Sequence, residues 1–244
     1  MTASGAFASL SAMPRRAVCA LIAFLVSAAA FSQGPDLSKL PPAEKLAALL
    51  ERFGSFQKGL KTLQADFVQT RNSSLLAHES VSRGRLFFEA PDQIRWEYES
   101  PLRMTVLIAG GVAVTYRPEE KRAERVEVSR MQRRVFHFLS ARKPLDELKR
   151  YFSFTFKDPG PPGDYELILD PTSRHVRRRV KSLAVEIDRT RLLPVGVSWV
   201  ESDGDSTAYA FSDIRVDEKL PEGTFTLDLP PDVHVVELRL GAGE

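Results

Sequence analysis

Two kinds of hydrophobic periodicity divide the chain. The leucines that recur at helical spacing near its start are Leu46, Leu49, Leu50 and Leu60. They follow Pro41 and Pro42, and proline is tolerated in the first turn of a helix. The spacing predicts an amphipathic helix over residues 42–61, with one face packed on a larger body. Beyond it the period changes to two, which is typical of strands with one buried face.

This alternation continues through most of the chain. Its apolar members are Phe67, Leu86, Phe88, Ile94, Trp96, Tyr98, Met104, Val106, Ile108, Val114, Tyr116, Leu167, Leu169, Val185, Ile187, Val197, Trp199, Tyr209 and Phe211. Gly110-Gly111 and Asp203-Gly204 are hairpin signals. The apolar phase slips between Phe211 and Ile214, which predicts a bulge, and a late strand is expected at residues 225–229. Short strands with few helices between them favour a sheet or barrel.

A helical interruption is expected over residues 129–152, in the middle of the strands. The apolar side chains that would share its helix faces are Met131, Val135, Phe138, Leu139, Leu145 and Leu148. A single curved sheet has one apolar face to hide, and these helices and the N-terminal helix are the available covers. The aromatic side chains of the strands would line the concave side, where a cavity would suit an apolar ligand.

The first thirty residues have the pattern of an export signal. Arg15 and Arg16 form a positive region, an apolar run covers residues 17–26, and small residues up to Ala30 suit cleavage. The apolar run is too short for a comfortable transmembrane helix. We therefore expect export to the periplasm by a cleavable signal peptide over residues 1–30.

The remainder is expected to be a flexible lead over residues 31–42, followed by one domain over residues 43–240. The formal charge of +2 is carried by the two early arginines, so the exported part is close to neutral. A neutral chain is a poor candidate for nucleic-acid binding. Cys19, the only cysteine, lies inside the apolar run of the signal, so we expect neither a disulfide nor thiol chemistry in the exported part.

Catalytic and metal-binding motifs are missing from the sequence. The histidines are His78, His137, His175 and His234. None has metal-ligand spacing to another candidate ligand, and no Gly-x-Ser-x-Gly or nucleotide-binding glycine pattern occurs. We expect no cofactor and no enzymatic activity, so a secreted hydrolase is disfavoured.

A dense basic run permits two interpretations. Its members are Arg174, His175, Arg177, Arg178, Arg179 and Lys181. The run could bind an anionic partner or a lipid headgroup surface. It could equally be an exposed hairpin whose charge is balanced by acidic neighbours, and the near-neutral total favours this second interpretation.

Residues 67–116 resemble the outer-membrane lipoprotein carrier family, LolA. The resemblance rests on Phe67-Val68-Gln69, Gly84-x-Leu86-x-Phe88, Pro91-x-x-Ile94-Arg95-Trp96-x-Tyr98-x-x-Pro101 and the strand–Gly-Gly–strand ending in Tyr116-x-Pro118. The later helical interruption and strands follow in the same order, so the resemblance covers roughly residues 43–235.

The resemblance implies a mainly β fold with α elements. This fold is an unclosed antiparallel β-barrel, with the N-terminal helix and short helices forming a lid over a hydrophobic cavity. It implies a monomeric periplasmic carrier that binds acyl chains of lipoproteins, or a related lipid. Such a carrier would receive its cargo from an inner-membrane ABC exporter (LolCDE-like) and deliver it to an outer-membrane receptor (LolB-like).

One position departs from the family pattern. Family members often have an arginine directly before the proline of this turn, and that arginine helps to hold the lid. Here the position is Ala90, before Pro91. Arg95 on the following strand is the candidate replacement for the lid latch. An alternative function is a periplasmic sensor of lipid or lipoprotein built on the same half-barrel, although such sensors usually carry a further domain and no room for one is expected here.

Overall fold

The computed structural model describes residues 37, 40–74, 78–127 and 150–238. The helices are α2 (Pro42–Gly59) and α5 (Arg174–Arg177). The strands are β1 (Thr62–Asn72), β2 (Ser80–Glu89), β3 (Gln93–Ser100), β4 (Met104–Ala109), β5 (Val112–Arg117), β6 (Arg122–Glu127), β7 (Phe152–Lys157), β8 (Tyr165–Pro171), β9 (Val180–Ile187), β10 (Pro194–Glu201), β11 (Ser206–Val216) and β12 (His234–Leu238).

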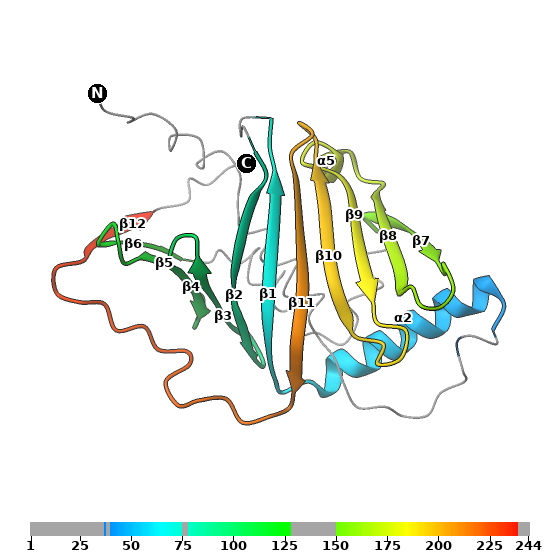
Figure 1. The fold of residues 1–244 in the computed structure, drawn as a ribbon, viewed down its shortest axis with the longest axis horizontal. Coiled ribbons are helices and arrows are strands. Elements are labelled where there is room, and N and C mark those ends of the chain that lie inside the picture. Colours follow the sequence, from blue (N-terminus) through cyan, green and yellow to red (C-terminus); the bar gives the residue numbers. More distant parts are fainter. Residues whose placement is uncertain (1–36, 38–39, 75–77, 128–149, 239–244) are drawn as a thin grey trace.

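All twelve of these strands belong to one curved sheet (Figure 1). The strand order is β12-β6-β5-β4-β3-β2-β1-β11-β10-β9-β8-β7, and the pairs are antiparallel except for β12 on β6. β7 and β12 stand at opposite ends of this order, so the sheet is an open half-barrel. The predicted unclosed antiparallel architecture is confirmed, since two-residue alternation specifies strands that bury one face.

The predicted turns are present where the sequence placed them. Gly110 and Gly111 both have positive φ values, 56° and 77°, and join β4 to β5. Such values are costly for residues that carry a Cβ atom, so glycine suits this tight hairpin. The predicted bulge is also present, because Asp213 and Ile214 face the single residue Ala65 across the ladder of β1 and β11.

Helix α2 packs on one side of the half-barrel (Figure 1). Its Leu49 and Leu50 are buried in the same core cluster as the strand side chains. Asp158, in the β7–β8 connection, accepts hydrogen bonds from Lys45 of α2 and from Arg189 of the β9–β10 connection. Both cations lower the pKa of the Asp158 carboxyl, Arg189 more than Lys45. This charged cluster ties the start of α2 to the ends of four strands.

One sequence expectation near the end of the domain is wrong. Residues 225–229 form no strand. They lie in the connection between β11 and β12, where Phe225, Leu227 and Leu229 are half-buried. Alternation alone cannot separate a hydrogen-bonded strand from an extended segment laid on a sheet. Leu37, within the expected flexible lead, is only 3% exposed and belongs to the core.

Candidate functional site

The register of the strands identifies one apolar face, which we call the inner face. Phe67 of β1 pairs with Gly84 of β2, which pairs with Tyr98 of β3. The cross-strand pairs place on this face the following predicted cavity residues: Phe67, Leu86, Phe88, Ile94, Trp96, Tyr98, Met104, Val106, Ile108, Leu167, Leu169, Val185, Ile187, Val197, Trp199, Tyr209 and Phe211. The sequence pattern thus brings seventeen side chains from eight strands onto one surface.

The expected inward direction of Val114 and Tyr116 is wrong. The two-residue turn pairs Ala109 with Val112, and therefore Leu107 with Val114 and Thr105 with Tyr116. Paired residues point to the same face, and Leu107 lies opposite to its neighbours Val106 and Ile108. Val114 and Tyr116 consequently belong to the outer face, and β5 presents Ala113 and Thr115 to the inner face.

Aromatic rings fill the middle of the inner face. The Phe67 ring lies 5.0 Å from the rings of both Trp96 and Tyr98 and 5.7 Å from that of Tyr209, measured between centroids. The Tyr98 and Tyr209 hydroxyl oxygens are 3.0 Å apart. These distances are typical of favourable edge-to-face and offset packing. The rings therefore form a packed cluster that stabilises the middle of the sheet.

Burial along the inner face is uneven. The side chains that are at most 6% exposed are Phe67, Leu86, Ile94, Trp96, Ile108, Leu167, Leu169, Val185, Ile187, Val197, Trp199, Tyr209 and Phe211. The half-buried ones are Phe88, Tyr98, Met104 and Val106, and they come from β2 to β4. The less tightly buried inner surface of these strands is where an apolar ligand would require the least displacement of side chains.

The six predicted lid residues lie outside the residues that the structure describes. They are Met131, Val135, Phe138, Leu139, Leu145 and Leu148. Tyr151, at the end of the expected helical interruption, lies in a turn, and Phe152 already belongs to β7. The lid stays a prediction.

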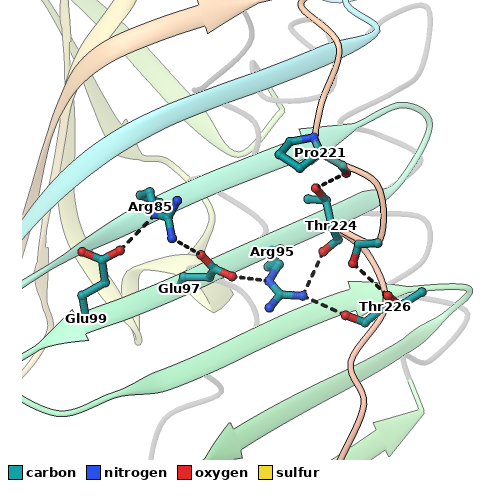
Figure 2. A network of polar contacts seen from close by, with 8 residues as sticks. Arg85, Arg95, Glu97, Glu99, Pro221, Thr224 and Thr226 are labelled. Carbon is teal, nitrogen blue, oxygen red and sulfur yellow. Dashed lines mark hydrogen bonds and ion pairs between the residues drawn. The ribbon is translucent and has the colours of Figure 1, made fainter.

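Arg95 contacts residues 217–233, the segment that connects β11 to β12 (Figure 2). Its guanidinium donates hydrogen bonds to the carbonyl oxygens of Thr224 and Thr226, at 2.9 and 2.8 Å, and forms an ion pair with Glu97 at 2.7 Å. Arg95 alternates with Ile94 and Trp96, so it extends from the outer face, away from the predicted cavity. These contacts fasten residues 217–233 to β3.

The outer face of β2 and β3 carries a polar network that the sequence pattern did not reveal (Figure 2). Arg85 pairs with Glu97 and Glu99, both at 3.0 Å, and Glu97 also binds Arg95. The sequence does contain a signal for this network, because charged residues occupy every second, outward-facing position of both strands. These residues are Arg83 and Arg85 on β2 and Arg95, Glu97 and Glu99 on β3. Cross-strand pairs of opposite charge stabilise adjacent strands.

A second polar cluster lies where β10 turns into β11. Glu201 is 6% exposed, and its burial raises the pKa of its carboxyl. Hydrogen bonds, chiefly from Ser73, lower the pKa of Asp205, whose carboxylate also faces Arg71. The negative charges of Asp203 and Asp205 also raise the pKa of Glu201, whereas Arg71 lowers it. Among the described residues, no group of three or more His, Cys, Asp or Glu side chains could hold a metal ion.

Comparisons with known proteins agree with this architecture. The family model described as "Outer membrane lipoprotein carrier protein LolA" matches residues 58–228. An outer-membrane lipoprotein carrier protein of Chromohalobacter salexigens is 28% identical over 196 residues, covering 80% of this chain and 86% of the relative. The corresponding protein of Methylococcus capsulatus is 27% identical over 191 residues, covering 76% and 86%.

Solved structures with a similar course of the chain include proteins of several kinds. The Pseudomonas aeruginosa MucA/MucB complex gives a TM-score of 0.48 at 14% identity, over 79% of this chain and 63% of the other. An uncharacterised conserved protein of Thermus thermophilus gives 0.49 at 10% identity, over 81% and 100%. The LolA superfamily protein NE2245 of Nitrosomonas europaea gives 0.37 at 11% identity, over 74% and 97%.

The molecule is an open antiparallel half-barrel with one apolar face, which is the architecture of a binding protein. The family model covers more than two thirds of the sequence, and the chain belongs to the LolA family of outer-membrane lipoprotein carrier proteins. The sequence-based resemblance is confirmed, as is the expectation of a carrier or binding protein in place of an enzyme. No helix in the described part of the chain is long and apolar enough to cross a bilayer.

Proposed function

We propose that this protein is a periplasmic carrier that holds acyl chains of lipoproteins, or of a related lipid, against the inner face of its half-barrel. One observation carries the proposal. The residues matched by the lipoprotein-carrier family coincide with the sheet whose inner face gathers seventeen predicted apolar side chains. The names of the curated relatives support the same class of cargo.

Hydrocarbon burial supplies the driving force. Transfer of one methylene from water is worth about 0.8 kcal/mol, so a chain of about sixteen carbons gains on the order of 10 kcal/mol. A carrier must also release its cargo. If protein side chains occupy the same surface when cargo is absent, net affinity is the difference between two burials, which keeps binding reversible. The predicted lid would supply those side chains.

The proposed acyl site lies on the inner face of β2 to β5. Phe88, Met104 and Val106 are half-buried there, beside the packed aromatic cluster to which Tyr98 belongs. Methionine suits a surface that must adapt to different chains, because its thioether side chain repacks at little cost. Entry of cargo at this position would leave the Phe67 cluster intact.

The transfer route is part of the same proposal. The protein would accept lipoprotein from an inner-membrane ABC exporter and deliver it to a receptor at the outer membrane. The export signal expected over residues 1–30 and the family of the chain support a periplasmic place of action.

Two valines on adjacent strands provide a matched test. Val106 of β4 faces inward and Val114 of β5 faces outward, and both are half-buried. The test compares Val106→Glu with Val114→Glu by titrating delipidated protein with a fluorescent sixteen-carbon acyl probe. A carboxylate against hydrocarbon is unfavourable, so Val106→Glu should weaken binding by about tenfold or more. Val114→Glu should stay within about twofold of the parent.

Folding is checked by circular dichroism and by thermal unfolding of each variant. If Val106→Glu fails to fold, the isosteric Val106→Thr takes its place, with an expected loss of about threefold in affinity. Equal loss in the inward and outward variants, or an unchanged affinity in the inward one, would contradict acyl binding on the inner face. Mass spectrometry of extracts from purified protein identifies the cargo itself.

A further inference from the structure

A group of cations surrounds α5 at one end of the sheet. It consists of Arg150, Arg174, Arg177, Arg178, Arg179 and Lys181, which we call the α5 basic patch. All six residues are exposed. None forms an ion pair with a carboxylate of the residues that the structure describes.

Eight arginines elsewhere in the described part of the chain have a carboxylate partner, namely Arg71, Arg85, Arg95, Arg117, Arg122, Arg125, Arg189 and Arg215. Among the described residues directly beside the patch, Asp170 and Asp203 are acidic and exposed. Within the described part of the chain, the cations of the patch therefore outnumber these exposed carboxylates, which supports the interpretation of an anion-binding surface.

Backbone contacts hold the patch in a defined place. Ser202 of the β10–β11 turn donates its hydroxyl to the Arg178 carbonyl and its backbone N–H to the Arg179 carbonyl. The Arg177 guanidinium donates to the Thr172 carbonyl at 2.6 Å. Arg174, Arg177 and Arg178 line an open hollow of about 520 Å³. The backbone that carries these cations is thus held in a defined place.

An exposed aromatic residue adjoins the same patch. Tyr151 is 47% exposed, follows Arg150, and its carbonyl accepts hydrogen bonds from the backbone N–H groups of Thr172 and Ser173, directly before α5. Tyrosine is enriched at the boundary between a bilayer and water, where its ring and hydroxyl meet different surroundings. Arginines without a carboxylate partner among the described residues, beside an exposed tyrosine, have the composition of a surface that meets lipid headgroups.

We propose that the α5 basic patch, together with Tyr151, docks the protein onto a bilayer surface that contains anionic phospholipids. Arginine binds phosphate with several fixed donors, and juxtamembrane basic clusters are attracted to anionic lipid surfaces. The patch lies at the edge of the sheet formed by β7 to β9, apart from the proposed acyl site on β2 to β5. The membrane-docking proposal can therefore be tested independently of the proposed acyl-chain binding.

Vesicle flotation tests the docking. The exported chain, with its N-terminus determined by mass spectrometry, is mixed with vesicles of phosphatidylcholine alone or with about one third phosphatidylglycerol. The patch variant is Arg174→Gln/Arg177→Gln/Arg178→Gln. The control variant, Lys61→Gln/Arg122→Gln/Lys219→Gln, removes the same charge from exposed positions on other elements. Each juxtamembrane cation contributes about fivefold to binding, so the patch variant should bind the anionic vesicles about a hundredfold less tightly.

The control variant should keep most of its binding, and Tyr151→Ser should lose a few fold. Binding of the parent should also fall steeply as salt rises from 50 to 300 mM, because exposed charges are screened. Equal loss in the patch and control variants, or equal binding to neutral vesicles, would overturn the proposal. So would full competition by 10 mM inorganic phosphate at constant ionic strength, which would indicate a small-anion site. Binding to polyglutamate without binding to vesicles would indicate an acidic protein partner instead.

Discussion

The inner faces of two regions of the sheet are packed differently. In β8 to β10, the inner side chains Leu167, Leu169, Leu183, Val185, Ile187, Val197 and Trp199 are all 6% exposed or less. In β4 and β5, Met104, Val106, Ala113 and Thr115 are half-buried, and only Ile108 is fully buried. Both regions have the same alternating pattern in the sequence, so alternation alone does not determine how tightly a face is packed.

The two regions share one apolar cluster but differ in their further support. That cluster contains α2 and inner side chains of β2 to β4 and of β8 to β10, and the Asp158 cluster fastens α2 at the β8 to β10 end. The β2 to β5 region is fastened on its outer face, where Arg95 holds residues 217–233. On the inner face of β2 to β4, Phe88, Met104 and Val106 are nevertheless only half-buried, and a reversible binding surface requires side chains that can be displaced.

Gly84 lies at the boundary between the two regions and should give the largest effect. A Cβ atom at this position would lie 1.9 Å from the Glu97 carbonyl oxygen and 2.9 Å from the Phe67 ring. Neither the backbone of β3 nor the packed ring can move far, so Gly84→Ala should lower the free energy of unfolding by more than about 3 kcal/mol. Urea unfolding measures the change, and Gly59→Ala, which meets no atom within 4 Å, is the control.

Matched valines test the packing difference directly. Val185 is 1% exposed in β9, and Val106 is half-buried in β4. Val185→Ala should cost about 2–3 kcal/mol of unfolding free energy, because it leaves a cavity in a closely packed cluster. Val106→Ala should cost about 1 kcal/mol or less, because its surroundings can adjust. Equal losses in urea unfolding would show that the two regions are equally well packed.

Much of the fold could be predicted because its signals are local. Period-two alternation, the Gly110-Gly111 turn and the phase slip before Ile214 each constrain a few neighbouring residues, and each prediction is confirmed. The prediction that Val114 faces inward is wrong, although the sequence contains the information that places it on the outer face. A two-residue turn fixes the register, and the register sets each residue's face.

Features that depend on distant segments could not be predicted. Arg95 donates hydrogen bonds to Thr224 and Thr226, about 130 positions later in the sequence. No sequence pattern near Arg95 indicates this contact. For the same reason residues 225–229 were mistaken for a strand. Residues 222–225 form a turn instead, and whether a segment hydrogen-bonds to a neighbouring strand depends on the whole sheet.

The outer-face support of β2 to β5 can be tested at Arg95. Arg95→Met keeps most of the side-chain volume but removes the hydrogen bonds to Thr224 and Thr226 and the pair with Glu97. We expect a loss of about 2 kcal/mol and faster amide hydrogen exchange in residues 217–233. Arg83→Met, an exposed position on β2, is the control. Unchanged exchange in that segment would contradict the fastening role of Arg95.

The smallest expected effect concerns the fastening of α2 and depends on pH. Lys45 and Arg189 hold the pKa of Asp158 below its ordinary value of 3.8. The folded state therefore gains stability from ionised Asp158 above pH 3.8, and this gain disappears as the pH falls below that value. Asp158→Asn should cost about 1 kcal/mol at pH 7, and the difference from the parent in urea unfolding should shrink toward pH 3. Asp228→Asn, at an exposed position, is the control. A constant difference between pH 7 and pH 3 would mean that Asp158 acts through its shape and not through its charge.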